Sequence, residues 1–586
     1  MHLSSWFFRT FAFVPLLGLA LFSCVKERPT LVYQSAVLGD GGRIARNLYR
    51  SYWVPPASDS DLVSVAIVPS RPKVEFRALH RMRIRAWSEN ASWEVASPPE
   101  VVWRVTGLGV TRPAILSYYA SVDQRLVPRT GQKPVGPLLK WRTRGFKAAR
   151  WIGPPAMDTQ APYATLERWI LSLTAPASER GAQAVCDEAN ALFKAACDVA
   201  SRVDLPPLGR GRLEAENGTF SKEFEGLLEI LSPHGPVAVQ GAATEEVRGD
   251  TSNEQYGPRL FLVPNPAGEL SLVQQTAFRD YLEGVVPAEL FALAPAEALK
   301  AQAVVARTFA ARFNGASRLT GHPLSETPFF ICSTTACQVY RGVTLKRPSS
   351  SAAVADTKDL VLRDATGDLA ETFYHSTCGG HTEPRTNVMG SRSRPYLFGV
   401  SDLLPDTAAL PLSTDLEVQA FLAAPPASYC GAATVAHPER WRWESRLGVS
   451  DIERVLDSLS LKPPLLDVSP GKRGASGRIL EISFTTPAGK KRVVGELKIR
   501  KLLGGLPSSL FVFEAERDGG RIAGLKIHGA GRGHGVGLCQ LGAVGRAERG
   551  QSYAEILAAY YPGTSLAPLF VPAESPSALA PQRRNP

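Results

Sequence analysis

The chain has 586 residues, of which 44% are hydrophobic and 21% charged, and these proportions are ordinary for a folded globular protein with a large core. Lysine and arginine together exceed aspartate and glutamate by 11, and the sequence pI is near 9.2. A basic surface attracts anionic polymers and phospholipid head groups. We exclude nucleic acid as the partner, because the basic residues are scattered and no helix-turn-helix, zinc-finger or RNA-binding signature occurs.

Residues 1–24 have the pattern of a signal peptide. Arg9 precedes an apolar run from Phe11 to Phe22 that is too short to span a bilayer comfortably. The run ends in LFSC, which resembles the lipobox of bacterial lipoproteins, so Cys24 is predicted to carry a lipid. An uncleaved anchor or ordinary cleavage nearby are the alternatives. No Asp follows Cys24, so we expect an exported, periplasmic, lipid-anchored protein, at the outer membrane if the host has one.

Residues 25–150 are predicted to be a strand-rich region. Segments such as LVSVAIV, VEFRAL and EVVWRV alternate apolar and polar residues and are separated by Pro or Gly. This pattern is typical of antiparallel sheets. No catalytic constellation is visible there, and the region can be a sheet extension of the domain that follows or a binding or scaffold element.

Residues 151–204 are predicted to be a helical segment, from LERWILSL and ERGAQAVCDEANALFKAACDVASRV. On one straight helix Cys186 and Cys197 would lie about 16 Å apart. A disulfide cannot span that distance. A straight helix with two buried thiols is therefore favoured over a helical hairpin clipped by a disulfide, which an oxidising compartment would allow.

Strands are expected again from about residue 205, with PNPAGE as a hairpin turn that leads to residues 278–313. From Pro295 onward, apolar residues recur at helical spacing, which predicts a buried helix. These residues are Leu299, Ala303, Ala306, Ala310 and Phe313. Glu297 lies in the first turn, where a carboxylate offsets the helix dipole, and is interpreted as structural.

Glu289 differs from Glu297 because apolar residues surround it and no basic residue lies within several positions. Desolvation penalises the charged form of such a carboxyl, which therefore tends to keep its proton and can act as a general acid. The alternative is a surface glutamate in a loop, since most glutamates are exposed.

Two cysteine and histidine motifs follow, CSTTACQVYRG and FYHSTCGGHTEP. Sulfur and imidazole are the ligands that zinc prefers, so a structural zinc ion held by four of these side chains is one interpretation. The candidate ligands are Cys332, Cys337, Cys378 and His381, or His375 in place of His381. A disulfide between Cys332 and Cys337, or plain buried thiols, are the other two interpretations. His375 follows a predicted strand, where it can line a cleft or hydrogen-bond the glycine turn.

Five motifs in register over about residues 205–566 resemble the SpoIID/LytB family of peptidoglycan proteins. They are DYLEGVVPAEL, EALKAQAVVARTFA, CSTTACQVYRGV, FYHSTCGGHTE and GRGHGVGLCQLGA. Two departures stand out. Ala336 occupies a position where zinc-binding relatives have a histidine, and Cys539 and Leu541 replace a serine and a tryptophan of the family's usual GHGVGMSQWGA.

The resemblance implies a lytic transglycosylase that cuts peptide-free glycan strands, with Glu289 as its single catalytic acid/base and no required cofactor. One carboxyl suffices for that reaction, because the sugar's own hydroxymethyl group replaces an activated water. The substrate contacts would be His375, Arg532, His534 and Gln540. Some relatives instead enhance a cell-wall amidase without cutting glycan, so an amidase or an envelope complex is the expected protein partner.

The predicted fold class is α+β, with a catalytic domain over residues 205–566 that combines an antiparallel sheet with the buried helix after Glu289. SYAEILAAYYPGTSL near its end is predicted to be an amphipathic helix. Residues 567–586 are rich in Pro, Ala and Ser and are predicted to be a disordered tail.

Overall fold

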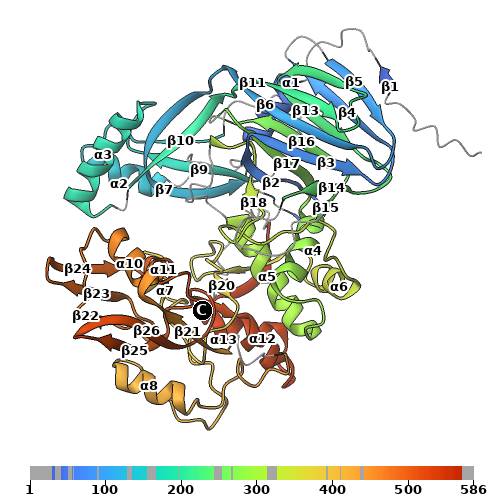
Figure 1. The fold of residues 1–586 in the computed structure, drawn as a ribbon. Coiled ribbons are helices and arrows are strands. Elements are labelled where there is room, and N and C mark those ends of the chain that lie inside the picture. Colours follow the sequence, from blue (N-terminus) through green and yellow to red (C-terminus); the bar gives the residue numbers. More distant parts are fainter. Residues whose placement is uncertain are drawn as a thin grey trace, which may run out of the picture.

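The computed structural model describes residues 30–32, 41–50, 56, 58–88, 92–128, 135–154, 166–195, 197–242, 254–265, 268–312, 326–390, 393–409, 411–435 and 441–570. These residues form a mixed α+β protein, which confirms the predicted fold class (Figure 1). The predicted signal peptide and Cys24 lie outside the described residues. Within the described ranges, every helix is too short or too polar to cross a bilayer.

Two large sheets form the upper part of the molecule in Figure 1, and each combines strands from before and after residue 205. The first has the order β1 (Thr30–Val32), β5 (Ser92–Ser97), β4 (Met82–Trp87), β13 (Leu227–Leu231), β16 (Arg259–Pro264), β17 (Leu270–Ala277), β2 (Leu62–Arg71), β18 (Ile331–Cys332). The second has the order β12 (Ser221–Glu225), β11 (Leu208–Ala215), β6 (Val102–Arg112), β3 (Lys73–Ala78), β14 (Val237–Gln240), β15 (Glu254–Tyr256). The strand-rich region is therefore a sheet extension of the following segment, and residue 205 does not separate two sheets.

Burial along these strands matches the sequence pattern. Strand β3 alternates, with Val74, Phe76 and Ala78 in the core and the charged residues between them facing outward. Strand β16 is buried almost throughout because it lies in the middle of the eight-stranded sheet. It pairs antiparallel with β17 across the PNPAGE turn, which confirms the predicted hairpin.

A smaller sheet of four strands corrects the prediction for residues 151–204. Its order is β10 (Asp198–Leu205), β7 (Ile115–Pro128), β9 (Leu166–Ser172), β8 (Arg150–Ile152). LERWILSL forms strand β9 and not a helix, because a short apolar run with Trp and Ile fits either period and pairing with β7 decides it.

The single straight helix across Cys186 and Cys197 is also wrong. Helix α3 (Glu179–Phe193) ends at Lys194, whose left-handed backbone turns the chain back toward β10. The Asn190 side chain bonds both backbone groups of Cys197 and holds this reversal. Cys186 and Cys197 then form a disulfide, between a helix and the start of a strand and not within a helical hairpin.

Helices α4 (Phe278–Glu289), α5 (Ala296–Arg312) and α6 (Pro348–Asp356) lie below the two large sheets in Figure 1. Helix α5 is rich in alanine, the strongest helix former, and it is buried on almost every side. It packs against α4, α6, α12 (Gln540–Ala547) and α13 (Tyr553–Tyr560). Glu297 accepts hydrogen bonds from Lys300 and from the backbone N–H of Tyr553, as its structural interpretation requires.

The C-terminal part contains short sheets and a second hydrophobic core. Its three-stranded sheets have the orders β21 (Arg442–Leu447), β26 (Arg521–Ala530), β25 (Phe511–Asp518), and β22 (Asp467–Pro470), β23 (Glu481–Thr486), β24 (Gly489–Val494). Its helices are α7 (Arg385–Val388), α8 (Asp415–Ala423), α10 (Val449–Ser458) and α11 (Glu496–Leu502).

Two strand pairs return the chain to the central helices. Strand β19 (Leu360–Arg363) pairs with β28 (Ser565–Pro568), and β20 (Tyr374–His375) runs parallel to β27 (Leu538–Cys539). Ala567 and Pro568 belong to β28, so the predicted tail begins too early, and residues 571–586 lie outside the described residues. The predicted helix near the end is α13.

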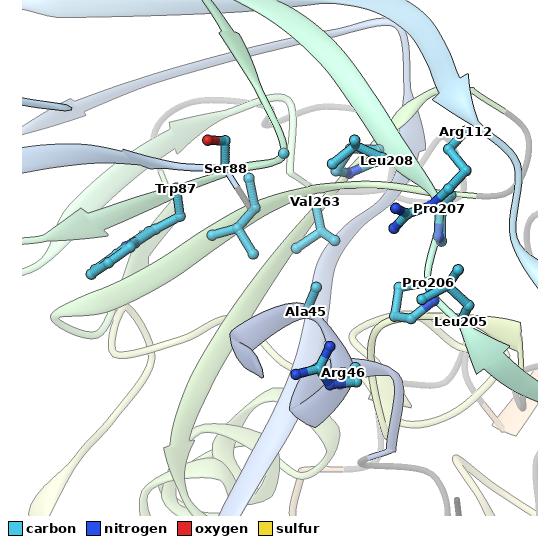
Figure 2. Close-up of a pocket in the computed structure, with 13 residues that line it drawn as sticks. Ala45, Arg46, Trp87, Ser88, Arg112, Leu205, Pro206, Pro207, Leu208 and Val263 are labelled. Carbon is cyan, nitrogen blue, oxygen red and sulfur yellow. The ribbon is translucent and has the colours of Figure 1, made fainter. Parts of the chain in front are cut away.

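A pocket lies between α1 (Gly41–Arg50) and strands of the two large sheets (Figure 2). Arg46, Trp87 and Arg112 line it, together with apolar residues around Pro206. None of the residues that the sequence predicts for catalysis, substrate or metal binding lines this pocket. It is therefore separate from the candidate site.

Candidate active site at the end of helix α4

Glu289 is the last residue of α4, so it lies at a helix end and not in a loop. Val285 and Val286 are fully buried in the preceding turn, and Leu290 follows in extended conformation. The Leu290 N–H still donates to the Val286 carbonyl and closes the helix. This geometry holds the Glu289 side chain, which is only partly exposed, at a fixed place against the neighbouring elements.

Three separate segments contact the Glu289 carboxyl. The backbone N–H of Val339 donates to Oε1 at 2.6 Å. The side chains of Tyr374, on β20, and Gln540, at the start of α12, are also within hydrogen-bonding distance of it. Gln540 donates in addition to Gln302 of α5 at 3.3 Å, so its orientation is fixed from the other side. The predicted surface-loop alternative for Glu289 does not fit these contacts.

Burial raises the pKa of Glu289 to about 7, although hydrogen bonds from Val339, Tyr374 and Gln540 oppose part of the shift. A carboxyl with this pKa is protonated in a large fraction of molecules at neutral pH and is also a usable base after losing its proton. General acid/base catalysis is most effective when the pKa lies near the working pH. The site can therefore give a proton to a leaving group and take one back.

Gln338 is a second hydrogen-bond partner of the Tyr374 hydroxyl. Its Nε2 donates to the Ala306 carbonyl at 3.3 Å, and its Oε1 accepts the Tyr374 hydroxyl proton at 3.0 Å. While the hydroxyl donates its one proton to Gln338, its oxygen presents lone pairs toward Glu289 and can accept from the protonated carboxyl. Turned toward the carboxylate, the same hydroxyl donates to it and lowers the pKa of Glu289.

Cys332 and Cys337 form a disulfide with an S–S distance of 2.06 Å. Of the three interpretations of this motif, the structure therefore has the disulfide, and the predicted zinc set of Cys332, Cys337, Cys378 and His381 is not assembled. His381 Nδ1 instead lies 2.7 Å from the Thr382 carbonyl. The disulfide closes the loop just before Val339, and so it constrains the segment that contacts the acid.

Among the predicted substrate contacts, His375 is 4% exposed and its Nδ1 donates to the Val536 carbonyl at 3.2 Å. Its burial favours the interpretation that it holds the glycine turn. His534 is partly exposed, its ring centroid lies 5.6 Å from that of His375, and Arg532 is exposed. Burial and the charges of Arg478 and Arg500 lower the pKa of His534 to about 3, so it is neutral at neutral pH.

Neither Glu371 nor Glu383 is a second acid beside Glu289. Burial alone would raise the pKa of Glu371, but Arg394, Arg312 and Arg385 outweigh it and hold that pKa below its ordinary value. Glu383 accepts hydrogen bonds from Ser476 and from neighbouring backbone N–H groups. Both carboxylates are engaged in structure, and neither is among the groups that contact Glu289.

The sequence predictions missed Tyr374, Gln338 and Val339. All three lie inside the motifs that drew attention to their neighbours, Cys337 and His375. Successive residues of a strand point to opposite faces, so choosing His375 over Tyr374 required knowing which face of β20 meets Glu289. The motif therefore pointed to this stretch of the chain, but it did not show which of its side chains faces Glu289.

Comparison with known proteins finds matches to one named family. Residues 267–363 match the family described as Stage II sporulation protein, and residues 383–537 match a domain of unknown function. An uncharacterised protein of Brachyspira hyodysenteriae is 30% identical over 340 residues, which cover 56% of this chain and 76% of the relative.

Two relatives have functional names. An amidase enhancer of Bacillus subtilis is 30% identical over 305 residues, covering 49% of this chain but only 40% of that protein. Stage II sporulation protein D of Bacillus amyloliquefaciens is 29% identical over 304 residues, covering 50% of this chain and 75% of the relative. The family match over residues 267–363 includes Glu289, and the chain therefore belongs to the SpoIID/LytB family, which has cell-wall related roles.

Proposed function

We propose that the protein is a lytic transglycosylase that cleaves peptide-free glycan strands of peptidoglycan. The observation that carries this proposal is the single partly buried carboxyl of Glu289, whose pKa of about 7 suits both proton donation and proton removal. The net charge of +11 agrees with an anionic wall polymer as the surface that the protein approaches.

In the proposed reaction Glu289 first protonates the glycosidic oxygen, and the bond from that oxygen to the anomeric carbon breaks. The resulting carboxylate then takes the proton of the sugar's own hydroxymethyl group, whose oxygen bonds to the anomeric carbon. The proton returns to Glu289, and an anhydro end is left on the product. Since the nucleophile belongs to the substrate, no second carboxylate is needed.

We propose that Arg532, which is exposed, and His534, which is partly exposed, contact sugar hydroxyls. Gln540 has a different task, because its amide orients Glu289. Export, lipidation of Cys24 and a periplasmic location belong to the same proposal, since the substrate lies outside the cytoplasm.

The test is product analysis. Purified full-length protein would be incubated with intact and with peptide-free glycan strands, and the products would be analysed by mass. Anhydro ends from the peptide-free strands are expected. Binding of the strands without any anhydro product would reject the enzyme and favour the second candidate.

That second candidate is a non-catalytic enhancer of a cell-wall amidase. The similarity to the amidase enhancer of Bacillus subtilis favours it. An enhancer would raise the rate of an added amidase on intact wall while producing no anhydro ends by itself. Glu289→Gln would leave that stimulation unchanged, whereas it would remove the activity of the transglycosylase.

The pH dependence follows from the pKa of Glu289. The acid must be protonated when substrate binds, so kcat/KM is expected to be constant below about pH 6 and to fall about tenfold per pH unit well above pH 7. The profile would be measured with peptide-free strands across pH 5–9 at constant ionic strength, with about 90% of the free enzyme's acid form lost one unit above the pKa. A rate that stays flat to pH 9 would contradict the assignment.

A further inference from the structure

Three cysteines and one aspartate from four distant segments meet in the C-terminal half. They are Cys378, Asp402, Cys430 and Cys539, all buried, and their ligand atoms all lie within 4.8 Å of one another. Cys378 follows β20 and Cys539 ends β27, which is paired with β20. Nothing in the proposed catalytic cycle uses these groups, so the cluster calls for its own explanation.

The distances fit a tetrahedral ion. The Sγ atoms of Cys378 and Cys430 are 3.6 Å apart, and Cys378 Sγ lies 3.5 Å from Oδ2 of Asp402. Zinc bonds of about 2.3 Å to sulfur and about 2.0 Å to oxygen give tetrahedral edges of about 3.8 Å and 3.5 Å. We propose that Cys378, Cys430, Cys539 and Asp402 bind one Zn²⁺ ion in a closed structural site.

Backbone N–H groups already point at the sulfurs. Gly380 N donates to Cys378 Sγ at 3.3 Å, and Cys539 Sγ accepts from Cys378 N at 3.1 Å and from Gly542 N at 3.3 Å. Such bonds stabilise thiolates, the form that binds zinc. Gly542 is required here, because a Cβ at this position would lie 2.6 Å from Oδ2 of Asp402.

The aspartate is oriented by groups behind it. Tyr560 donates its hydroxyl proton to Oδ1 at 2.6 Å, and Arg546 Nη2 lies 3.4 Å from the same oxygen. These bonds leave Oδ2 facing the sulfurs, and ligands held in this way bind metal more tightly. Oδ2 also accepts from the Cys430 backbone N–H at 3.1 Å, which holds this oxygen beside the sulfurs.

Nearby arginines offset the charge of the complex. Three thiolates and a carboxylate around a divalent cation carry an excess of two negative charges. Arg546 is paired with Asp402, and Arg442 interacts electrostatically with Cys378 and Cys430. The buried Nε and Nη2 atoms of Arg442 have no hydrogen-bond partner within the described part of the chain. Both cations are therefore placed to compensate a buried anionic site.

This site differs from the zinc set that the sequence motifs predict. It retains Cys378, replaces Cys332 and Cys337 by Cys430 and Cys539, and uses an aspartate where a histidine was expected. A disulfide between Cys378 and Cys430 is the competing state, and it would leave Cys539 as an unpaired thiol. The ion would link the segments that follow β20 and end β27. Tyr374 lies on β20 and Gln540 directly follows Cys539, and both side chains contact the acid Glu289.

The test is the metal content of full-length protein purified without chelator. One zinc ion per chain is expected by elemental analysis, together with thiolate-to-metal charge-transfer bands in the near ultraviolet after exchange with Co²⁺. The three cluster thiols should react with a thiol reagent in the native protein only after a chelator removes the ion. Metal-free protein with a Cys378 to Cys430 disulfide in its peptide map would overturn the proposal.

Variants distinguish the proposed cluster from the zinc set that the sequence motifs predict. Cys539→Ser and Asp402→Asn are expected to lower zinc content and to weaken or shift the Co²⁺ bands. Cys332→Ser/Cys337→Ser and His381→Ala should retain one zinc ion and unchanged bands. If a cluster variant does not fold, the Co²⁺ spectrum of the native chain decides alone, since bands without thiolate character contradict the ligand set. Zinc lost from the Cys332→Ser/Cys337→Ser variant, with its fold intact, would also reject it.

Discussion

Glu289→Gln is expected to lower kcat for cleavage of peptide-free glycan strands by about 10²–10⁴-fold, the range for removal of an essential general acid/base. Glutamine keeps the shape and can keep the Val339 hydrogen bond at the carbonyl oxygen, but it cannot give a proton to the leaving oxygen. KM should change little, because no substrate contact is assigned to Glu289. Steady-state rates of anhydro product formation would measure the loss.

The matched control is Glu297→Gln, the same substitution at the start of the following helix. Glu297 accepts from Lys300 and from Tyr553 N and has no contact with Glu289 among those that fix the acid. Its variant should keep most of the activity. If Glu289→Gln forms anhydro products at the native rate, Glu289 is not the catalytic acid, although the reaction class would stand.

Glu289→Gln also tests whether burial of the Glu289 carboxyl lowers the free energy of unfolding. Burial raises the pKa of Glu289 from 4.5 to about 7, so the folded chain binds the proton more tightly than the unfolded chain. The folding stability that this tighter proton binding provides is fully present below about pH 4.5 and is lost as the pH rises through 7. Glu289→Gln should therefore gain stability relative to the native chain between pH 5 and pH 8, by at most about 3 kcal/mol.

The sequence predicts the site better than it predicts the chain around it. The apolar neighbours of Glu289 are enough to anticipate a raised pKa, because desolvation depends on local composition. The contacts that aim the carboxyl come from Val339, Tyr374 and Gln540, which are 50 or more positions away in the chain. Only strand pairing and helix packing bring them together, and neither is visible in spacing.

The cysteines show the same limit. The pairing of Cys186 with Cys197 depends on one left-handed residue, Lys194, which a helical pattern does not mark. Cys430 and Cys539 meet Cys378 because β20 lies beside β27 and a loop returns to both. Motif proximity instead pointed to Cys332, whose partner the structure places five residues away.

Arg307→Ala is expected to lower the free energy of unfolding by about 3–5 kcal/mol, because it leaves a buried carboxylate without its partner. Arg307 is 0% exposed and Asp59 is 2% exposed. The guanidinium donates to both carboxylate oxygens, at 2.7 Å and 2.9 Å, and also to the Val354 and Leu360 carbonyls. Urea unfolding followed by tryptophan fluorescence would measure the change.

This ion pair holds the two helices that position the acid. The loop of Asp59 accepts hydrogen bonds from the backbone N–H groups of Phe278 and Arg279, which begin α4, while its side chain binds Arg307 of α5. Loss of Arg307 should therefore loosen α4 against α5 and lower kcat as well as stability. A drop in kcat together with a shift of the pH profile would report that Glu289 has moved.

An exposed pair of the same geometry provides the control. Arg446 donates to both oxygens of Glu516 at 3.0 Å and 2.6 Å, but the two side chains are 65% and 40% exposed. Water screens such a pair, so Arg446→Ala should cost less than about 1 kcal/mol. Equal losses for both arginines would mean that burial is not what makes the Asp59 pair important. A double variant, Asp59→Asn with Arg307→Met, should recover part of the loss, because it removes both buried charges together.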